Sequence, residues 1–160
     1  MGTVTALNRA VLGAGVAGGI VGAILLALYG LIVGLAHGME PSAAAALTLA
    51  YGARIIVGPG TPVDTGSGSL VVFVVLLVAI GWGIGFAFVA RSQQQLIARP
   101  ITSGIGFGVI IFFFMQLVFV AVNAFVQPGP NNAVLALCGC SFFFGVPVAY
   151  VVSTIAKRGR

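Results

Sequence analysis

The chain has 160 residues, of which 60% are hydrophobic and 6% are charged, and its formal net charge is +5. Soluble domains carry about 25% charged residues, so the composition excludes a water-soluble domain and indicates an integral membrane protein. The basic residues are spread over the ends of apolar runs instead of gathering on one surface, which argues against binding to nucleic acid.

Four uncharged runs each have the roughly 20 residues that a helix needs to cross a hydrocarbon core. We predict an all-α integral membrane protein whose single membrane domain, 1–160, is a bundle of four transmembrane helices. The predicted spans are about 10–37, 70–90, 101–126 and 132–156.

The first span opens with a glycine-rich stretch that matches a nucleotide-binding fingerprint. Gly13, Gly15 and Gly18 fit the pattern Gly-x-Gly-x-x-Gly, and an acid, Glu40, follows further along the chain. A dinucleotide-binding turn needs a strand before it and an amphipathic helix after it. Here a short arm precedes a helix that is apolar on all sides, so we interpret the glycines as the closely packed end of a membrane helix.

His37 ends the first span, close in sequence to Met39. It is a candidate ligand for haem or a chlorophyll-type pigment, and a copper site that combines His37, Met39 and Cys138 is chemically reasonable. No repeated ligand motif supports these sites. We therefore predict no metal and no required cofactor.

The segment 38–69 is predicted to hold an external helix and a loop. Pro41–Val57 is a good helix former, but a fifth span here would carry Arg54 into lipid. We expect this helix to lie along the membrane surface or to dip into the bundle. The glycine, proline and serine residues after it predict a loop.

Charge bias gives the expected topology. Six of the seven basic residues fall on one side of the four spans, and both acids fall on the other. By the positive-inside rule both termini are cytoplasmic, in the inner (cytoplasmic) membrane of a prokaryotic cell. The six are Arg9, Arg91, Arg99, Lys157, Arg158 and Arg160.

Small residues recur at three- and four-residue steps in every span. Between membrane helices the hydrophobic effect supplies little attraction, so packing depends on small residues that let backbones approach. The predicted helix-packing residues are Gly15, Gly19, Ala23, Ala27, Gly30, Gly34, Gly81, Gly85, Gly104, Gly108 and Gly145.

The third span carries two amides, Gln116 and Asn123, in line with its glycines. Polar side chains in lipid are costly unless partnered, so the amides either bind a ligand or fix helix packing by hydrogen bonds. Phe112 and Phe119 lie on the same face. We expect the helices to pack tightly at the cytoplasmic end and to splay outward, leaving an outer-leaflet crevice for lipid, quinone, carotenoid or a chlorophyll-type pigment.

A block across the second and third spans resembles small uncharacterised four-span prokaryotic membrane proteins, which place a glycine-rich helix start after a short basic loop. The resemblance implies the fold and no activity. It rests on Gly81-Trp82-Gly83, Arg99-Pro100, Gly104-Ile105-Gly106-Phe107-Gly108 and Met115.

No Ser/His/Asp set, paired carboxylates or ionisable group lies within the four spans, which argues against an enzyme and against a proton-coupled transporter. We expect a non-catalytic accessory or structural subunit of a larger respiratory or photosynthetic membrane complex, with other membrane subunits and lipids as partners. The alternatives are a small oligomeric transporter or channel built around Gln116 and Asn123, and a haem- or copper-binding protein that uses His37.

Overall fold

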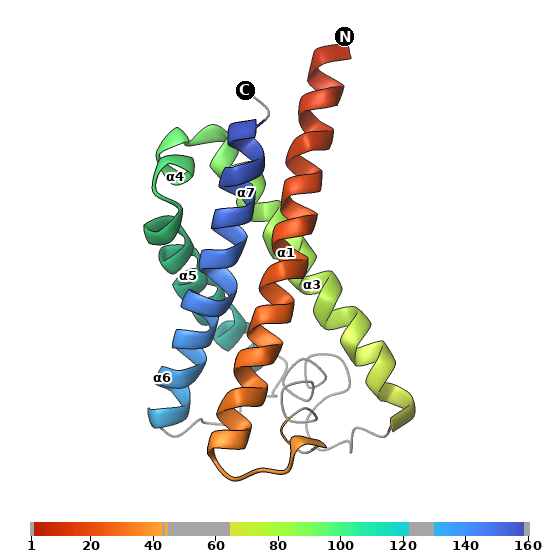
Figure 1. Ribbon diagram of the computed structural model, residues 1–160, viewed down its shortest axis with the longest axis vertical. Helices are drawn as coiled ribbons and strands as arrows, with labels where there is room; N and C mark the ends of the chain where they lie inside the picture. Colours follow the sequence, from red (N-terminus) through yellow and green to blue (C-terminus); the bar gives the residue numbers. More distant parts are fainter. Residues whose placement is uncertain (1, 43, 45–64, 122–129, 159–160) are drawn as a thin grey trace.

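The computed structural model describes residues 2–42, 44, 65–121 and 130–158 (Figure 1). Across these ranges the regular secondary structure is helical. The elements are α1 (Gly2–Ala36), α3 (Thr65–Ser92), α4 (Gln94–Ala98), α5 (Pro100–Ala121), α6 (Pro130–Cys138), the π-helix η1 (Gly139–Gly145) and α7 (Val146–Arg158).

Four helical stretches are long and apolar enough to cross a membrane. They are Ala10–Ala36 in α1, Val72–Ser92 in α3, Pro100–Val118 in α5, and Ala133–Lys157, which runs through α6, η1 and α7. Within the described ranges, the prediction of an all-α protein with four candidate spans is confirmed, and these helices point to an integral membrane protein.

One connecting segment differs from the prediction, and a second one, for which no structure was predicted, is helical. Residues 65–69, expected in a loop, form the first turns of α3, because a helix that already exists gains one hydrogen bond for each residue added. The polar link after α3 contains the short helix α4. Ser103 Oγ lies 3.0 Å from the Leu96 carbonyl oxygen and 2.9 Å from that of Arg99, so it ties α4 to the first turn of α5.

The predicted external helix, 41–57, falls almost entirely outside the described residues. Of this segment, residues 41, 42 and 44 are described and are helical. Residues 122–126 of the predicted third span also lie outside.

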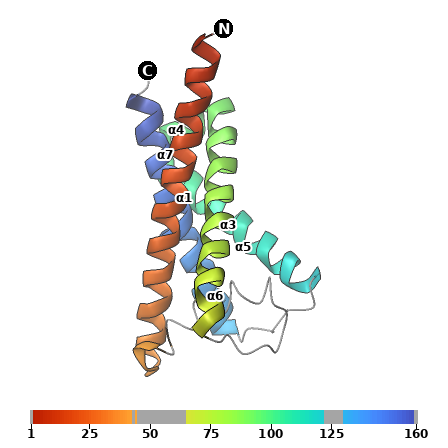
Figure 2. The ribbon, with the colours of Figure 1, turned by 90° about the vertical axis from the view of Figure 1, so that its right-hand side faces the viewer.

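The four spans alternate in direction, so α1 begins and α7 ends at the same end of the bundle, here called the termini end (Figure 1). The link from α3 to α4 lies there too. At the opposite end the first turns of α3 diverge from α1 in Figure 1, and the last turns of α5 diverge from the other helices in Figure 2.

The first span ends in a tight C-terminal cap. Gly38 has φ +76°, a left-handed conformation that glycine adopts without steric cost. Its N–H bonds to the Leu35 carbonyl at 2.9 Å, and the N–H of Met39 bonds to the Gly34 carbonyl at 3.1 Å. These two bonds form a Schellman motif, which satisfies carbonyls that the end of a helix otherwise leaves without partners.

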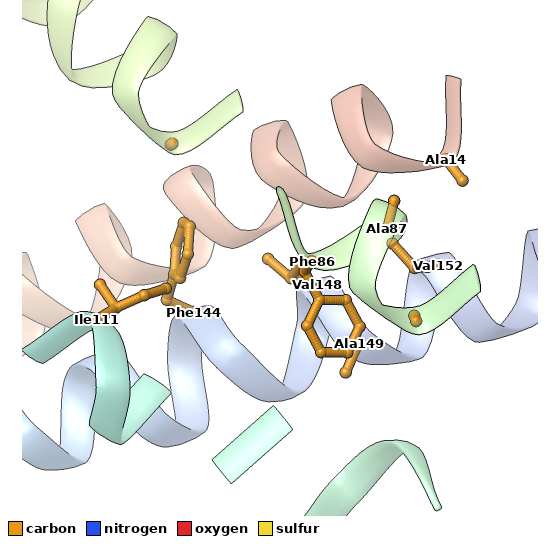
Figure 3. Packing of buried hydrophobic residues seen from close by; sticks show 10 residues of the cluster. Ala14, Phe86, Ala87, Ile111, Phe144, Val148, Ala149 and Val152 are labelled. Carbon is orange, nitrogen blue, oxygen red and sulfur yellow. The ribbon is translucent and has the colours of Figure 1, made fainter. Parts of the chain in front are cut away.

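The buried core runs along the centre of the bundle (Figure 3). It combines alanines, which let the helices approach, with a few larger side chains that fill the remaining space. Val148 and Ala149 of α7 are fully buried. The cluster is Ala14, Ala79, Phe86, Ala87, Ala90, Ile111, Phe144, Val148, Ala149 and Val152.

The fourth span changes from α- to π-helical geometry for seven residues, over η1. The N–H of Val146 bonds to the Ser141 carbonyl, five residues back, as a π-helix requires. Pro147 follows directly. Since proline has no N–H and its ring clashes with the carbonyl four residues earlier, it disfavours regular α-helix at this point.

Candidate functional site

The closest approach of α1 to α3 is built from three glycines, here called the α1–α3 contact. Gly83 of α3 lies between Gly15 and Gly19, one turn apart on α1. A Cβ added to Gly83 would lie 2.7 Å from the Gly19 nitrogen, and one added to Gly15 would lie 2.6 Å from Ile84 Cα. The two backbones therefore touch, as in membrane helix pairs that associate through small residues.

The same arrangement joins α5 to η1, here called the α5–η1 contact. Gly145 lies between Gly104 and Gly108 of α5, and a Cβ on Gly145 would lie 2.9 Å from the Gly108 nitrogen. A Cβ on Gly104 would lie 2.6 Å from Val146 Cα. The structure thus places Gly15, Gly19, Gly104, Gly108 and Gly145 of the predicted set at close helix contacts.

Gly81 and Gly85, which were predicted to be helix-packing residues, do not take part in the α1–α3 contact. Both are exposed, and a Cβ built on either meets no atom within 4 Å. Residues two positions apart on a helix point to nearly opposite sides, so the helix that places Gly83 against α1 must turn Gly81 and Gly85 outward.

A second face of α1 packs against η1 and α7 through glycines that the predicted stripe omits. A Cβ on Gly18 would lie 3.2 Å from the Val148 carbonyl oxygen, and one on Gly22 would lie 2.9 Å from Phe144 Cδ2. Gly18 and Gly22 are themselves four residues apart, so this spacing was present in the sequence.

The remaining small residues of the predicted α1 stripe have different surroundings. Ala23 packs against the core, whereas Ala27 is exposed. Gly30 is half-buried, and Gly34 faces Ala44, beyond the end of α1. Residues four positions apart on an α-helix differ by about 40° in direction. After three such steps, a residue of the stripe no longer faces the neighbouring helix that the first residue contacts.

Of the candidate ligand-binding side chains of the third span, those of Gln116 and Phe112 are described. Gln116 and Phe112 are half-buried, and the Phe112 ring makes an edge contact with that of Phe113, with centroids 5.5 Å apart. Asn123 and the side chain of Phe119 lie outside the described part of the chain. The outer-leaflet crevice that these residues were expected to line stays a prediction.

Aromatic rings join α3 to α5. Trp82 contacts Phe114 edge-on, with centroids 5.0 Å apart, and Phe86 contacts Phe107 at 4.7 Å. Phe144 is buried in the core, while Phe113 is 60% exposed. The described phenylalanines are therefore divided between the core, ring contacts and the outer surface.

His37 is exposed next to the cap of α1. Its Nδ1 donates a hydrogen bond to the Val33 carbonyl at 2.8 Å, which directs the other ring nitrogen, Nε2, away from that helix turn. Cys138 and Cys140 are half-buried free thiols. Among the residues that the structure describes, no group of three or more His, Cys, Asp or Glu side chains is placed to hold a metal ion.

Tyr29 joins the first and fourth spans. Its hydroxyl donates to the Leu135 carbonyl at 3.0 Å, and its ring stacks on that of Phe143 with centroids 4.5 Å apart. Gly139 leaves room for this ring, because a Cβ there would lie 2.8 Å from Tyr29 Cε1. Tyr29 is the one polar side chain between residues 10 and 36, and a polar atom in lipid needs a partner. That signal could have identified it.

Replacing Tyr29 by phenylalanine is expected to lower the free energy of unfolding by about 0.6 kcal/mol, a typical value for a hydrogen bond between membrane helices. The ring stacking would remain. The measurement is equilibrium unfolding in mixed detergent micelles. Tyr150→Phe is the matched control, since Tyr150 is 60% exposed. An equal loss in both variants would contradict a role for the hydroxyl of Tyr29.

Comparison of the chain with protein-family models, curated protein sequences and solved structures finds no match in any of the three. The resemblance to small four-span prokaryotic membrane proteins therefore stays a prediction.

Proposed function

We propose that the protein is a non-catalytic integral membrane subunit that associates with other membrane helices through the outward face of α3. The observation that carries this proposal is the pair Gly81 and Gly85, which together form a small-xxx-small motif. Three other pairs of glycines four residues apart each contact the backbone or side chains of a neighbouring helix: Gly15 and Gly19, Gly18 and Gly22, and Gly104 and Gly108. Gly81 and Gly85 face open space.

The outward face of α3 has the shape that helix association requires. Leu77, Gly81, Gly85 and Phe88 follow one another at three- and four-residue steps, and all four are exposed. The two glycines leave the helix backbone without side chains between Leu77 and Phe88, which are 49% and 47% exposed. A partner helix could approach the backbone there, gaining van der Waals contact that disordered lipid chains do not match.

The energetics of the helix support the same proposal. Glycine in a helix interior is less favourable than alanine by about 1 kcal/mol. At Gly83 the glycine is needed because a Cβ would overlap the backbone of α1. At Gly81 and Gly85 no contact within the described bundle needs the space, so a partner outside the chain would account for them.

The partner is expected among the membrane subunits of a larger complex. Its respiratory or photosynthetic nature, and the binding of quinone, carotenoid or a chlorophyll-type pigment, stay predictions. An absorption spectrum of the complex purified in mild detergent would identify haem or pigment directly.

The test places leucine at both positions, Gly81→Leu with Gly85→Leu, in the full-length protein in its native membrane. We expect the yield of photo-crosslinks from a probe at position 77 to a specific membrane protein to fall severalfold, because the leucine side chains keep a partner helix away from the backbone of α3. Gly106→Leu on α5 is the matched control, since Gly106 is also exposed with no atom within 4 Å of an added Cβ.

Crosslinks that are unchanged in the double variant, or equally reduced by Gly106→Leu, would contradict the proposal. Flux in proteoliposomes that Gln116→Leu abolishes would instead favour the transporter or channel.

A further inference from the structure

An open cavity of about 300 Å³ lies at the termini end, between the ends of α1, α3 and α7. Its walls are apolar and its residues mostly small: Ala14 of α1, Ala87 and Ala90 of α3, and Val152 of α7 line it. Figure 3 shows Ala14, Ala87 and Val152 converging from these three helices. Arg91, at the last turn of α3, also lines the cavity, which therefore combines a hydrocarbon slot with a cation.

A second open cavity, of about 320 Å³, shares the lining residue Ile97 of α4 with the first. Its other lining residues include the amides Gln94 and Gln95 and the cation Lys157. Amide N–H groups and an ammonium group are hydrogen-bond donors. The second cavity thus has hydrogen-bond donors and a positive charge for a phosphate, and the first has apolar walls for an acyl chain.

The depth of these cavities matches that of a lipid headgroup. The candidate spans in α3 and α7 end at Ser92 and Lys157, so Arg91 and Lys157 lie where hydrocarbon gives way to the polar interface. Ala14 and Val152 lie about a turn deeper along their helices. An occupant is therefore expected to be polar at Lys157 and apolar at Val152.

The charges at this end favour an anion. Arg99 lies between α4 and α5, and Arg158 ends α7, so further bases accompany Arg91 and Lys157. Both acids of the chain are elsewhere in the sequence: Glu40 follows the other end of α1, and Asp64 precedes α3. The basic residues of the sequence therefore outnumber the acidic side chains at this end, which favours an anionic occupant at the mouth of the cavities.

We infer that the two cavities together form a binding site for one anionic phospholipid. Its acyl chain lies along Ala14, Ala90 and Val152, and its phosphate is held between Arg91 and Lys157 with Gln94 and Gln95 as donors. Basic pockets between helices at the membrane surface bind anionic headgroups in this way. The inference is independent of the proposed subunit function, because it uses a different face of the bundle.

The test uses the full-length protein reconstituted in vesicles of phosphatidylcholine with a minor fraction of phosphatidylglycerol. Native mass spectrometry then measures the ratio of the two lipids that the released protein retains. We expect enrichment of phosphatidylglycerol in the wild type, and a loss of about tenfold in that enrichment for Arg91→Gln with Lys157→Gln. The single variants Arg91→Gln and Lys157→Gln are each compared with Arg99→Gln, which removes the same one charge at the same end. Arg99→Gln should retain the enrichment, since Arg99 lines neither cavity.

A second variant tests the apolar slot without changing charge. Ala156 is half-buried and lines the first cavity, so Ala156→Phe is expected to displace the acyl chain and lower the total retained phosphatidylglycerol about tenfold. Ala27→Phe, at an exposed position of α1, is the control for added bulk.

Three results would overturn the inference. The first is retention of the two lipids in the proportion of the vesicle. The second is an equal loss for Arg99→Gln, which would indicate attraction by net charge alone. The third is displacement of bound phosphatidylglycerol by inorganic phosphate with no effect of Ala156→Phe, which would indicate a phosphate site instead of a lipid site.

Discussion

Replacing Gly83 by leucine is expected to separate α3 from α1 and to lower the free energy of unfolding by about 3 kcal/mol, the upper part of the usual range for overpacking. The added Cβ would overlap the backbone of Gly15 and would lie 2.9 Å from Gly19 Cα. Backbone cannot rotate away as a flexible side chain can, so the two helices must move apart. Equilibrium unfolding in mixed micelles measures the loss.

The controls for Gly83→Leu lie two residues to either side on the same helix. Gly81→Ala and Gly85→Ala add a Cβ into open space, so in the isolated protein we expect each to be neutral or to stabilise by up to about 1 kcal/mol. A loss of stability at Gly81 or Gly85 comparable to that at Gly83 would show that a different face of α3 packs against α1.

Replacing Gly145 by leucine is expected to have a similar effect, about 3 kcal/mol, at the α5–η1 contact. A Cβ there would overlap the carbonyl of Gly104 and approach the Gly108 nitrogen to 2.9 Å. Because η1 is π-helical, relaxation of this variant is expected to change the fourth span itself. Besides unfolding, the exposure of the free thiol of Cys140 to a membrane-permeant alkylating reagent should increase.

Gly106→Leu is the control for the α5–η1 contact. It lies on α5 between Gly104 and Gly108 but points away from η1, and an added Cβ there meets nothing within 4 Å. Wild-type stability and thiol reactivity are expected for it. If Gly145→Leu behaved as Gly106→Leu does, the α5–η1 contact would not hold the fourth span in place.

The α1–α3 contact also determines the position of the outward face of α3 and of the cavity at the termini end. The position of Gly83 against α1 fixes the rotation of α3, and that rotation turns Gly81 and Gly85 outward. The same packing brings Ala14, Ala87 and Val152 around one cavity. A variant that breaks the α1–α3 contact should therefore impair both partner binding and lipid retention, whereas the variants aimed at each surface should impair only one.

The sequence by itself determined the helical class and the four candidate spans. An uncharged apolar run longer than a membrane is thick has few alternatives to a helix, because every backbone polar group must bond within the segment. Local chemistry was equally decisive at Gly38, where glycine ends α1 in a left-handed cap. The sequence also predicts helix contacts at glycines that lie four residues apart. Gly15, Gly19, Gly104 and Gly108 lie at such contacts.

Only the tertiary structure decided which face of each helix is used. α3 and α5 are apolar on all sides, so no polar face shows which side of either helix points away from the bundle. The sequence therefore does not distinguish the packing role of Gly83 from those of Gly81 and Gly85. Their rotation depends on the neighbour that each helix meets, which is a property of several spans together. The cavity lined by Arg91 and Val152 was hidden for the same reason: its residues come from helices far apart in the chain, and only their packing brings a cation beside an apolar slot.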